Sequence, residues 1–98
     1  MGLKDRFKKA REQREQSTWS INGHRGNIIL EDKYVLITII PNKEHIVFYR
    51  DIKRVERRNN FVMVSSVVED FRIAPLGVRG AEDKAKDLQL SLLDKMSQ

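Results

Sequence analysis

Short runs of apolar and β-branched residues, separated by turn residues, fill most of the chain between residues 17 and 75. The densest run is Tyr34 to Ile40, and β-branched side chains of this kind fit a pleated, half-buried surface. Similar runs occur at 17–21, 27–31, 45–49, 52–58, 61–67 and 71–74. Asn22-Gly23, Asp32-Lys33 and Asn59-Asn60 stand between them as turns, Pro41 to Glu44 as a loop, and Glu69-Asp70 as a tight turn. The pattern therefore predicts six or seven short strands in an antiparallel meander that bends into a barrel or a pair of packed sheets.

The period of apolar residues changes after a loop from Pro75 to Gly80. Apolar residues then recur three or four positions apart, and charged residues occupy the other positions; the apolar set is Ala81, Ala85, Leu88, Leu92 and Met96, with Leu93 alongside. Glu82 and Asp83 stand at the beginning, where acidic side chains complement the helix dipole. We expect one amphipathic C-terminal helix that covers an open end or face of the sheets. The fold class is then α+β, mainly β.

The first sixteen residues differ from the rest of the chain. They consist largely of charged residues and glutamine, with Leu3, Phe7 and Ala10 at helical spacing. This segment is either a solvated helical or flexible arm, or an amphipathic helix that docks on a partner or a membrane. We therefore divide the chain into a basic arm, residues 1–16, and one domain, residues 17–98.

Charge is concentrated in two segments of the 98-residue chain, whose formal net charge is +5. The arm carries six bases against three acids, and the segment from Arg50 to Arg58 carries five bases against two acids. Local basicity of this kind suits an anionic partner. The chain has no cysteine, which excludes disulfides, zinc–thiolate sites and a cysteine nucleophile. The missing cysteines and a charged N-terminus without the apolar run of a signal peptide favour a cytoplasmic location, with the inner face of the membrane as the alternative.

The order of seven short strands and one C-terminal amphipathic helix resembles that of pleckstrin-homology-like (PH-like) domains. The segment Gly23-His24-Arg25-Gly26 before a strand that ends in an acidic turn resembles the opening of small bacterial members. The segment Asp51-Ile52-Lys53-Arg54-Val55 resembles their recurrent Asp-Ile-x-x-Val. The resemblance covers residues 19–96 and implies a binding scaffold without catalytic residues. The loop from Asn22 to Asn27 departs from the lipid-binding members, because its bases are only His24 and Arg25.

No arrangement of catalytic residues is visible, and we predict a protein that is not an enzyme and uses no metal, cofactor or small-molecule substrate. We expect His24 and His45 to be solvent-exposed in or beside loops, without metal-ligand spacing. Ser65-Ser66 lies within a strand and lacks the Gly-x-Ser-x-Gly turn that exposes a nucleophile.

The basic segment is the first candidate site for an anionic partner, and its residues are Arg50, Lys53, Arg54, Arg57 and Arg58. Guanidinium groups bind phosphates and carboxylates through paired hydrogen bonds. Strand alternation places Arg54 and Arg58 on one face and Arg57 on the other. The alternative is an edge strand whose charges prevent aggregation. Nucleic-acid binding is a weaker possibility, because aromatic residues flank this strand without alternating with its bases.

The arm is the second candidate site, through Leu3, Lys4, Arg6, Phe7, Lys8 and Lys9, either on a partner or on an anionic membrane surface. A third feature concerns the strands, since 28–30, 39–40, 46–48 and 61–64 place apolar residues on both faces. Either the helix and the arm cover the second face, or it is an interaction surface. We therefore expect a PH-like interaction module that binds a protein partner or forms a homo-oligomer, with peripheral membrane binding and nucleic-acid binding as alternatives.

Overall fold

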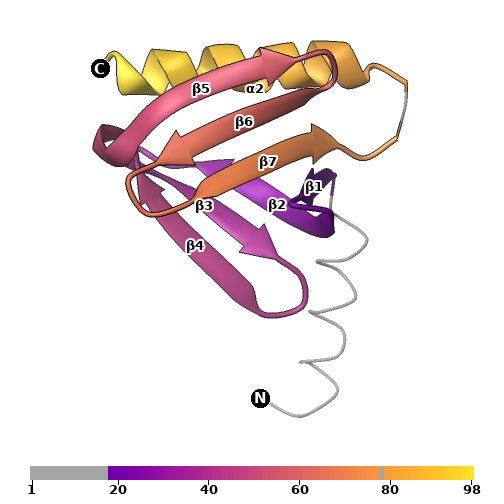
Figure 1. Ribbon diagram of the computed structural model, residues 1–98, viewed down its shortest axis with the longest axis horizontal. Helices are drawn as coiled ribbons and strands as arrows, with labels where there is room; N and C mark the ends of the chain where they lie inside the picture. The colour runs from indigo at the N-terminus through magenta and orange to yellow at the C-terminus, as the bar shows by residue number, and fades with distance from the viewer. Residues whose placement is uncertain (1–17, 78) are drawn as a thin grey trace.

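The structure is a computed structural model that describes residues 18–77 and 79–98, so the predicted arm lies outside the described residues. It contains seven strands, one 3-10 turn and one helix in the order β1(Trp19–Ile21) β2(His24–Leu30) β3(Tyr34–Ile39) β4(Lys43–Phe48) η1(Tyr49–Asp51) β5(Ile52–Arg58) β6(Phe61–Ser66) β7(Asp70–Pro75) α2(Ala81–Met96) (Figure 1). The strands form one antiparallel sheet in the spatial order β4-β3-β2-β1-β7-β6-β5. This confirms the predicted mainly β architecture with one C-terminal helix.

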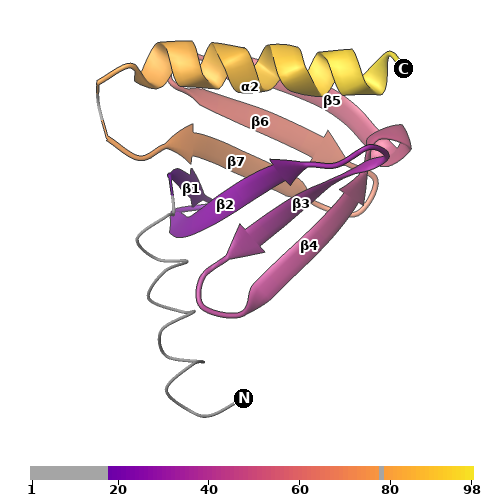
Figure 2. The same cartoon turned by 180° about the vertical axis from the view of Figure 1, so that it is seen from behind.

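The sheet curls into a half-barrel because its short central strand, β1, joins two halves. Trp19 pairs with Gly26 of β2 on one side and with Pro75 of β7 on the other. The half made of β2–β4 and the half made of β5–β7 cross each other, and α2 lies along the β5–β7 half (Figures 1 and 2). We call the side of each strand that faces the interior its inner face and the opposite side its outer face.

The core follows from strict alternation along the strands. In β3 and β6 every second residue is buried, and residues paired across neighbouring strands share a face. The inner faces contribute, among others, Ile37, Val62 and Phe71. The apolar stripe of α2 completes the core through residues such as Leu88 and Leu92, and burial of each such side chain contributes roughly 1.5–3 kcal/mol.

Two-residue turns set the register of the hairpins, as the sequence predicted. Asn22 and Gly23 both have positive φ, 53° and 89°, which is the geometry of the turn type that matches the twist of adjoining strands. Asn59 also has positive φ at the turn between β5 and β6. The amide of Glu31 donates to the carbonyl of Tyr34 (2.9 Å) and closes the Asp32-Lys33 turn.

Several boundaries differ from the prediction. β2 begins at His24, three residues before the predicted strand, so His24 is exposed as expected but lies on a strand and not in a loop. β4 begins at Lys43, within the predicted loop, and ends before Tyr49, which turns into η1. The turn before β7 lies at Val67-Val68, while Asp70 already belongs to the strand. The reason is a set of local hydrogen bonds from Ser66 to Glu69, described below, which position the turn two residues earlier than the acidic pair suggested.

α2 packs mainly against β5, β6, β7 and η1, and none of the described helices has the length and apolarity that a membrane-spanning segment requires. The helix therefore covers the inner side of the β5–β7 half. It leaves the outer face of β2–β4 without helical cover.

Candidate functional site

The five bases of the predicted anionic site do not form one cluster. Arg54 and Arg58 lie on the outer face of β5, because they pair with Ser65 and Phe61. Arg57 pairs with the buried Val62 and therefore lies on the inner face, near the end of the strand, where it is exposed. This is the alternation that the sequence predicted. Arg50 and Lys53 lie apart from these three arginines.

Lys53 lies at a register shift between Ile52 and Arg54, a β-bulge that bends the first part of β5. Arg50 lies in η1, before the strand begins, and its guanidinium carbon is 5.2 Å from the centre of the Phe48 ring. A pocket near this turn is lined by Asp32, Lys33, Phe48, Tyr49, Arg50, Lys95, Met96 and Gln98. Arg50 therefore belongs to a different part of the surface from Arg54 and Arg58.

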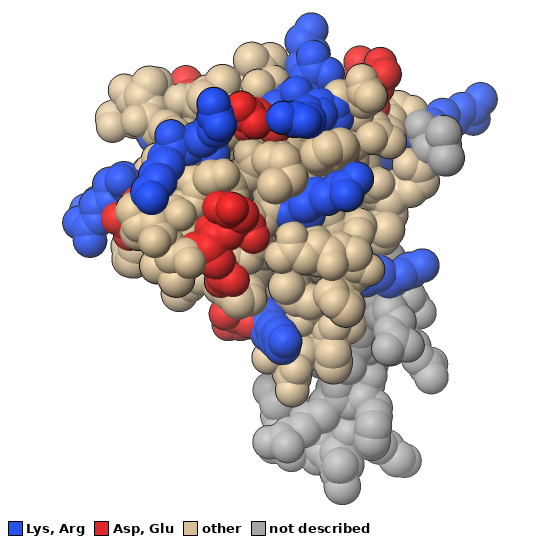
Figure 3. All heavy atoms as spheres, viewed as in Figure 1, with Lys and Arg blue, Asp and Glu red and all other residues tan. Residues whose placement is uncertain are grey.

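Acidic side chains reduce the positive charge on the outer face of β5. Glu56 lies between the two outer arginines, with its carboxylate 3.0 Å from Nε of Arg54 and 3.9 Å from a terminal nitrogen of Arg58. The arginine side chains are 70% exposed, so water screens both pairs. Figure 3 shows Lys and Arg side chains interspersed with Asp and Glu side chains on the side of β5–β7 that faces away from α2.

The sequence analysis missed Arg72 of β7 as a member of this outer face. Its guanidinium carbon lies 4.3 Å from the centre of the Phe61 ring, and Phe61 pairs with Arg58. Alternation with the buried Phe71 and Ile73 could have placed Arg72 outside. Its position over Phe61 depends on the pairing of β6 with β7, which the sequence does not give. Phe61 is the one aromatic residue that pairs with Arg58 in the described strands. Because the Arg72 guanidinium lies over one face of its ring, less of the ring is available for stacking on a nucleic-acid base.

The outer face of β2–β4 carries a row of apolar side chains. Ile29, Leu36 and Ile46 are direct neighbours across the three strands, and Tyr34 and Phe48 form the next row. Ile29, Ile46 and Phe48 are 48%, 58% and 39% exposed. The two rings of Tyr34 and Phe48 meet edge to face with their centres 5.8 Å apart. We call these five residues the apolar face. The sequence analysis singled out three of them, Ile29, Ile46 and Phe48, and missed Tyr34 and Leu36. The end of α2 reaches only the pocket beside Phe48.

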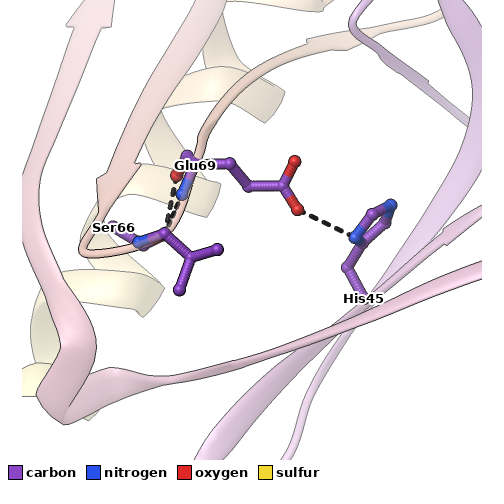
Figure 4. A network of polar contacts seen from close by, with 4 residues as sticks. His45, Ser66 and Glu69 are labelled. Atoms are coloured by element: carbon purple, nitrogen blue, oxygen red, sulfur yellow. Dashed lines mark hydrogen bonds and ion pairs between the residues drawn. The ribbon is translucent and has the colours of Figure 1, made fainter.

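The prediction of an exposed loop position for His45 was wrong. His45 lies on the inner side of β4, half-buried, with its ring centre 5.3 Å from that of Phe71. Its Nδ1 is 3.0 Å from Oε1 of Glu69 in the turn between β6 and β7 (Figure 4). The contact links the two halves of the sheet across the open side of the half-barrel. The Glu69 side chain, which the sequence analysis considered only as part of a tight turn, therefore takes part in this contact.

Ser66 fixes the same turn and has no contact with the histidine ring. Its Oγ donates to the carbonyl of Glu69 (2.6 Å) and accepts from the amides of Glu69 (3.1 Å) and Val68 (3.3 Å). Ser66, Glu69 and His45 thus lie close together, but the hydroxyl is bonded to the backbone (Figure 4). This trio lacks the serine–histidine contact that activates a nucleophile.

The phenol of Tyr49 has a pKa that its surroundings shift from the usual value. Burial raises the pKa of its phenol above the usual 10.0, and the nearby carboxylates of Glu31 and Asp32 raise it further. The hydroxyl donates to the carbonyl of Glu31 (2.7 Å) and so ties η1 to the turn between β2 and β3. The group acts as a structural link and titrates far from neutral pH.

The remaining predicted site residues, Leu3, Lys4, Arg6, Phe7, Lys8 and Lys9, lie outside the described residues. In residues 18–77 and 79–98, no group of three or more histidine or carboxylate side chains is arranged to hold a metal ion. No protein-family model matches the chain, and no curated protein sequence matches it.

Proposed function

We propose that this chain is a non-catalytic, PH-like interaction module that binds a protein partner or a second copy of itself through the apolar face. One observation carries the proposal: three strands present a continuous apolar row on a side that the helix leaves uncovered. Ile46 is the most exposed member of the row. Large exposed apolar side chains in contiguous positions are typical of interaction sites.

The basic groups supply attraction around this face in the proposed function. Arg50 borders the apolar face over Phe48, so it can bind an acidic group on a partner that docks there. Arg54, Arg58 and Arg72 lie on the other half of the sheet, where Glu56 and Asp70 offset them. We therefore assign these three a steering role for an anionic partner and not the main contact.

The PH-like assignment rests on the element order, seven antiparallel strands followed by one helix, together with the turn segments quoted above. A fold of this kind hosts many binding functions, so the site and not the fold carries the proposal. Membrane attachment through the arm stays a second hypothesis of the sequence. Nothing in the described residues favours it over protein binding.

The test compares the full-length protein with Ile46→Lys and with a matched control, Leu90→Lys. Leu90 is also a large apolar side chain and is 54% exposed, but it lies on α2. We expect wild type and Leu90→Lys to recover the same partner in affinity capture from host cells, or to self-associate equally in light scattering. Ile46→Lys should lose that interaction. Equal behaviour of all three proteins, or a strict monomer that recovers nothing, contradicts the proposal.

A further inference from the structure

β4 ends the sheet, and one side of its backbone has no neighbouring strand among the residues that the structure describes. The amide of Tyr49 donates to the carbonyl of Lys33 (3.1 Å), immediately after the paired part of β4. Bonded and non-bonded pairs alternate along an antiparallel ladder. The odd-numbered residues of β4 therefore bond to β3, and the backbone groups of Glu44, Ile46 and Phe48 point to the open edge.

Most of these outward groups have no partner in the part of the chain that the structure describes. None of the turn, loop or side-chain hydrogen bonds involves the amide or carbonyl of Glu44 or Ile46, or the amide of Phe48. The carbonyl of Phe48, the N-cap of η1, already accepts the first bond of that turn. A row of unpaired amides and carbonyls is a template for another strand. The side chains of the same three residues lie on the outer face, two of them in the apolar face.

We propose that β4 pairs with β4 of a second copy, antiparallel, around a two-fold axis at Ile46. This register follows from the geometry of the edge. Bonded pairs must join residues whose backbone groups point outward, and the two outer faces must be continuous. Pairing Ile46 with Ile46, and Glu44 with Phe48 in both directions, meets both conditions and uses the free amides and carbonyls of Glu44 and Ile46 and the free amide of Phe48.

The apolar face supports this register. Ile29, Leu36 and Ile46 form a row perpendicular to the strands. With Ile46 on the axis, the row of one copy continues directly into the row of the other. Ile46, the most exposed of the three at 58%, then lies at the centre of the interface, where buried apolar side chains contribute most to binding.

Charge complementarity points to a second copy as the occupant. Glu44 of one copy lies opposite Phe48 of the other, and the guanidinium of Arg50 lies over that same Phe48 ring, 5.2 Å from its centre. Each carboxylate therefore approaches an arginine, and the two-fold axis repeats the pair. An unrelated strand has no reason to carry an acid at this position. A second copy of β4 carries Glu44 at this position, and the two-fold axis gives the contact with Arg50 twice.

Two further apolar residues border the same edge. A groove beside β4 is lined by Glu44–Val47 and by the turn Ser66–Glu69. Val67 and Val68 of that turn are 57% and 85% exposed. A strand that lies along β4 meets these two valines on its inner side.

This inference rests on the proposed function and names its partner, and single-cysteine cross-linking tests it in the full-length chain. The protein has no cysteine of its own, so each introduced thiol is unique. Residues in a bonded antiparallel pair have Cα atoms about 5.5 Å apart, within the range of a disulfide. We expect Ile46→Cys to form a covalent dimer under mild oxidation, and Leu90→Cys to remain monomeric.

The register has its own control. Glu44→Cys and Phe48→Cys should each cross-link poorly alone, because equal residues other than Ile46 lie apart along the strands. A mixture of the two should cross-link efficiently. Efficient cross-linking of Glu44→Cys alone, or of Leu90→Cys, overturns the proposed register.

A charge exchange tests the same geometry without covalent bonds. Glu44→Arg and Arg50→Glu should each weaken self-association at least several-fold, and an equimolar mixture should restore it, because opposite charges then face each other across the axis. Failure of the mixture to restore association overturns the inference. If wild type is monomeric while Ile46→Lys loses a different protein partner, the inference is wrong and the proposed function stands.

Discussion

β4 and β5 are the two edge strands of one sheet, yet their exposed chemistry is opposite. β5 carries Lys53, Arg54, Glu56, Arg57 and Arg58, and a bulge bends it near its beginning. Charges and bulges are the devices by which edge strands avoid pairing with other chains. β4 has charged residues only at its first two positions and then continues His45-Ile46-Val47-Phe48. The comparison separates a protected edge from one that is open to a partner.

The outer faces of the two halves differ in the same way. The face of β5–β7 mixes arginines with acids, whereas the face of β2–β4 is apolar across three strands. The inner faces of both halves, in contrast, are mainly apolar, with exceptions such as His45 and Arg57, and they share one core. The two halves therefore differ mainly on their outer faces, as the proposed function requires.

The shared core gives the largest expected effect. Phe71 of β7 is 1% exposed and contacts His45 of β4, so Phe71→Ala should lower the free energy of unfolding by about 3–5 kcal/mol. Chemical denaturation followed by circular dichroism measures this. The neighbouring Arg72→Ala, on the outer face, should cost less than about 1 kcal/mol. Similar losses for both would show that the two faces of β7 are not distinct.

The junction of the two halves comes next. A Cβ added at Gly26 would clash with the carbonyl oxygen of Thr38 and lie 2.8 Å from Cδ1 of Ile21. Since backbone atoms cannot move aside cheaply, Gly26→Ala should cost roughly 1–3 kcal/mol in the same denaturation measurement. Arg25→Ala, one residue earlier, should be close to neutral. A neutral Gly26→Ala would mean that β1 and β3 adjust to the added methyl group.

The hydrogen bond between η1 and the turn that joins β2 and β3 gives a smaller, pH-dependent effect. Tyr49→Phe removes the hydrogen bond to Glu31 and should cost about 0.5–1.5 kcal/mol at neutral pH. Because the folded-state pKa of Tyr49 is raised, its contribution is fully present below pH 10.0 and is lost as pH rises through the raised value. Wild type should therefore lose stability above pH 10.0 more steeply than Tyr49→Phe. Parallel curves for the two proteins would contradict the shift.

The protected edge gives the smallest effect. Glu56→Gln breaks two solvent-screened ion pairs with Arg54 and Arg58 and should change the free energy of unfolding by less than about 1 kcal/mol. Added salt should reduce even this difference. Self-association should be unchanged, since the open edge is elsewhere. A change in the oligomeric state of Glu56→Gln would show that the interface lies on β5 and not on β4.

Much of the fold was predictable because it depends on local rules. The period of 3–4 residues predicted α2 from Ala81 to Met96, and the two-residue turns predicted the hairpins. Alternation also predicted that Arg54 and Arg58 would face away from Arg57. These features need only the spacing of residues that are close in sequence.

The features that the sequence did not reveal depend on contacts between distant segments. The pairing of His45 with Glu69 requires the curl of the sheet to bring β4 to the turn after β6. The position of Arg72 over Phe61 requires the register of two strands. The open backbone of β4 requires the order of all seven strands, because a simple meander would have paired β4 with β5, whereas β1 pairs with β7 and leaves β4 and β5 at the two edges.

The brevity of β1 has a kinetic consequence. Its three residues join two halves that are each built from neighbouring hairpins, whereas its own contacts reach across the chain: Asn22 bonds to Arg72, 50 residues away. Closing so long a loop costs chain entropy before any contact compensates, and such non-local pairing slows folding. The only tryptophan, Trp19, lies on this strand and packs against the core. We therefore expect its fluorescence to report the joining of the two halves, at a time that can be compared with the formation of each hairpin.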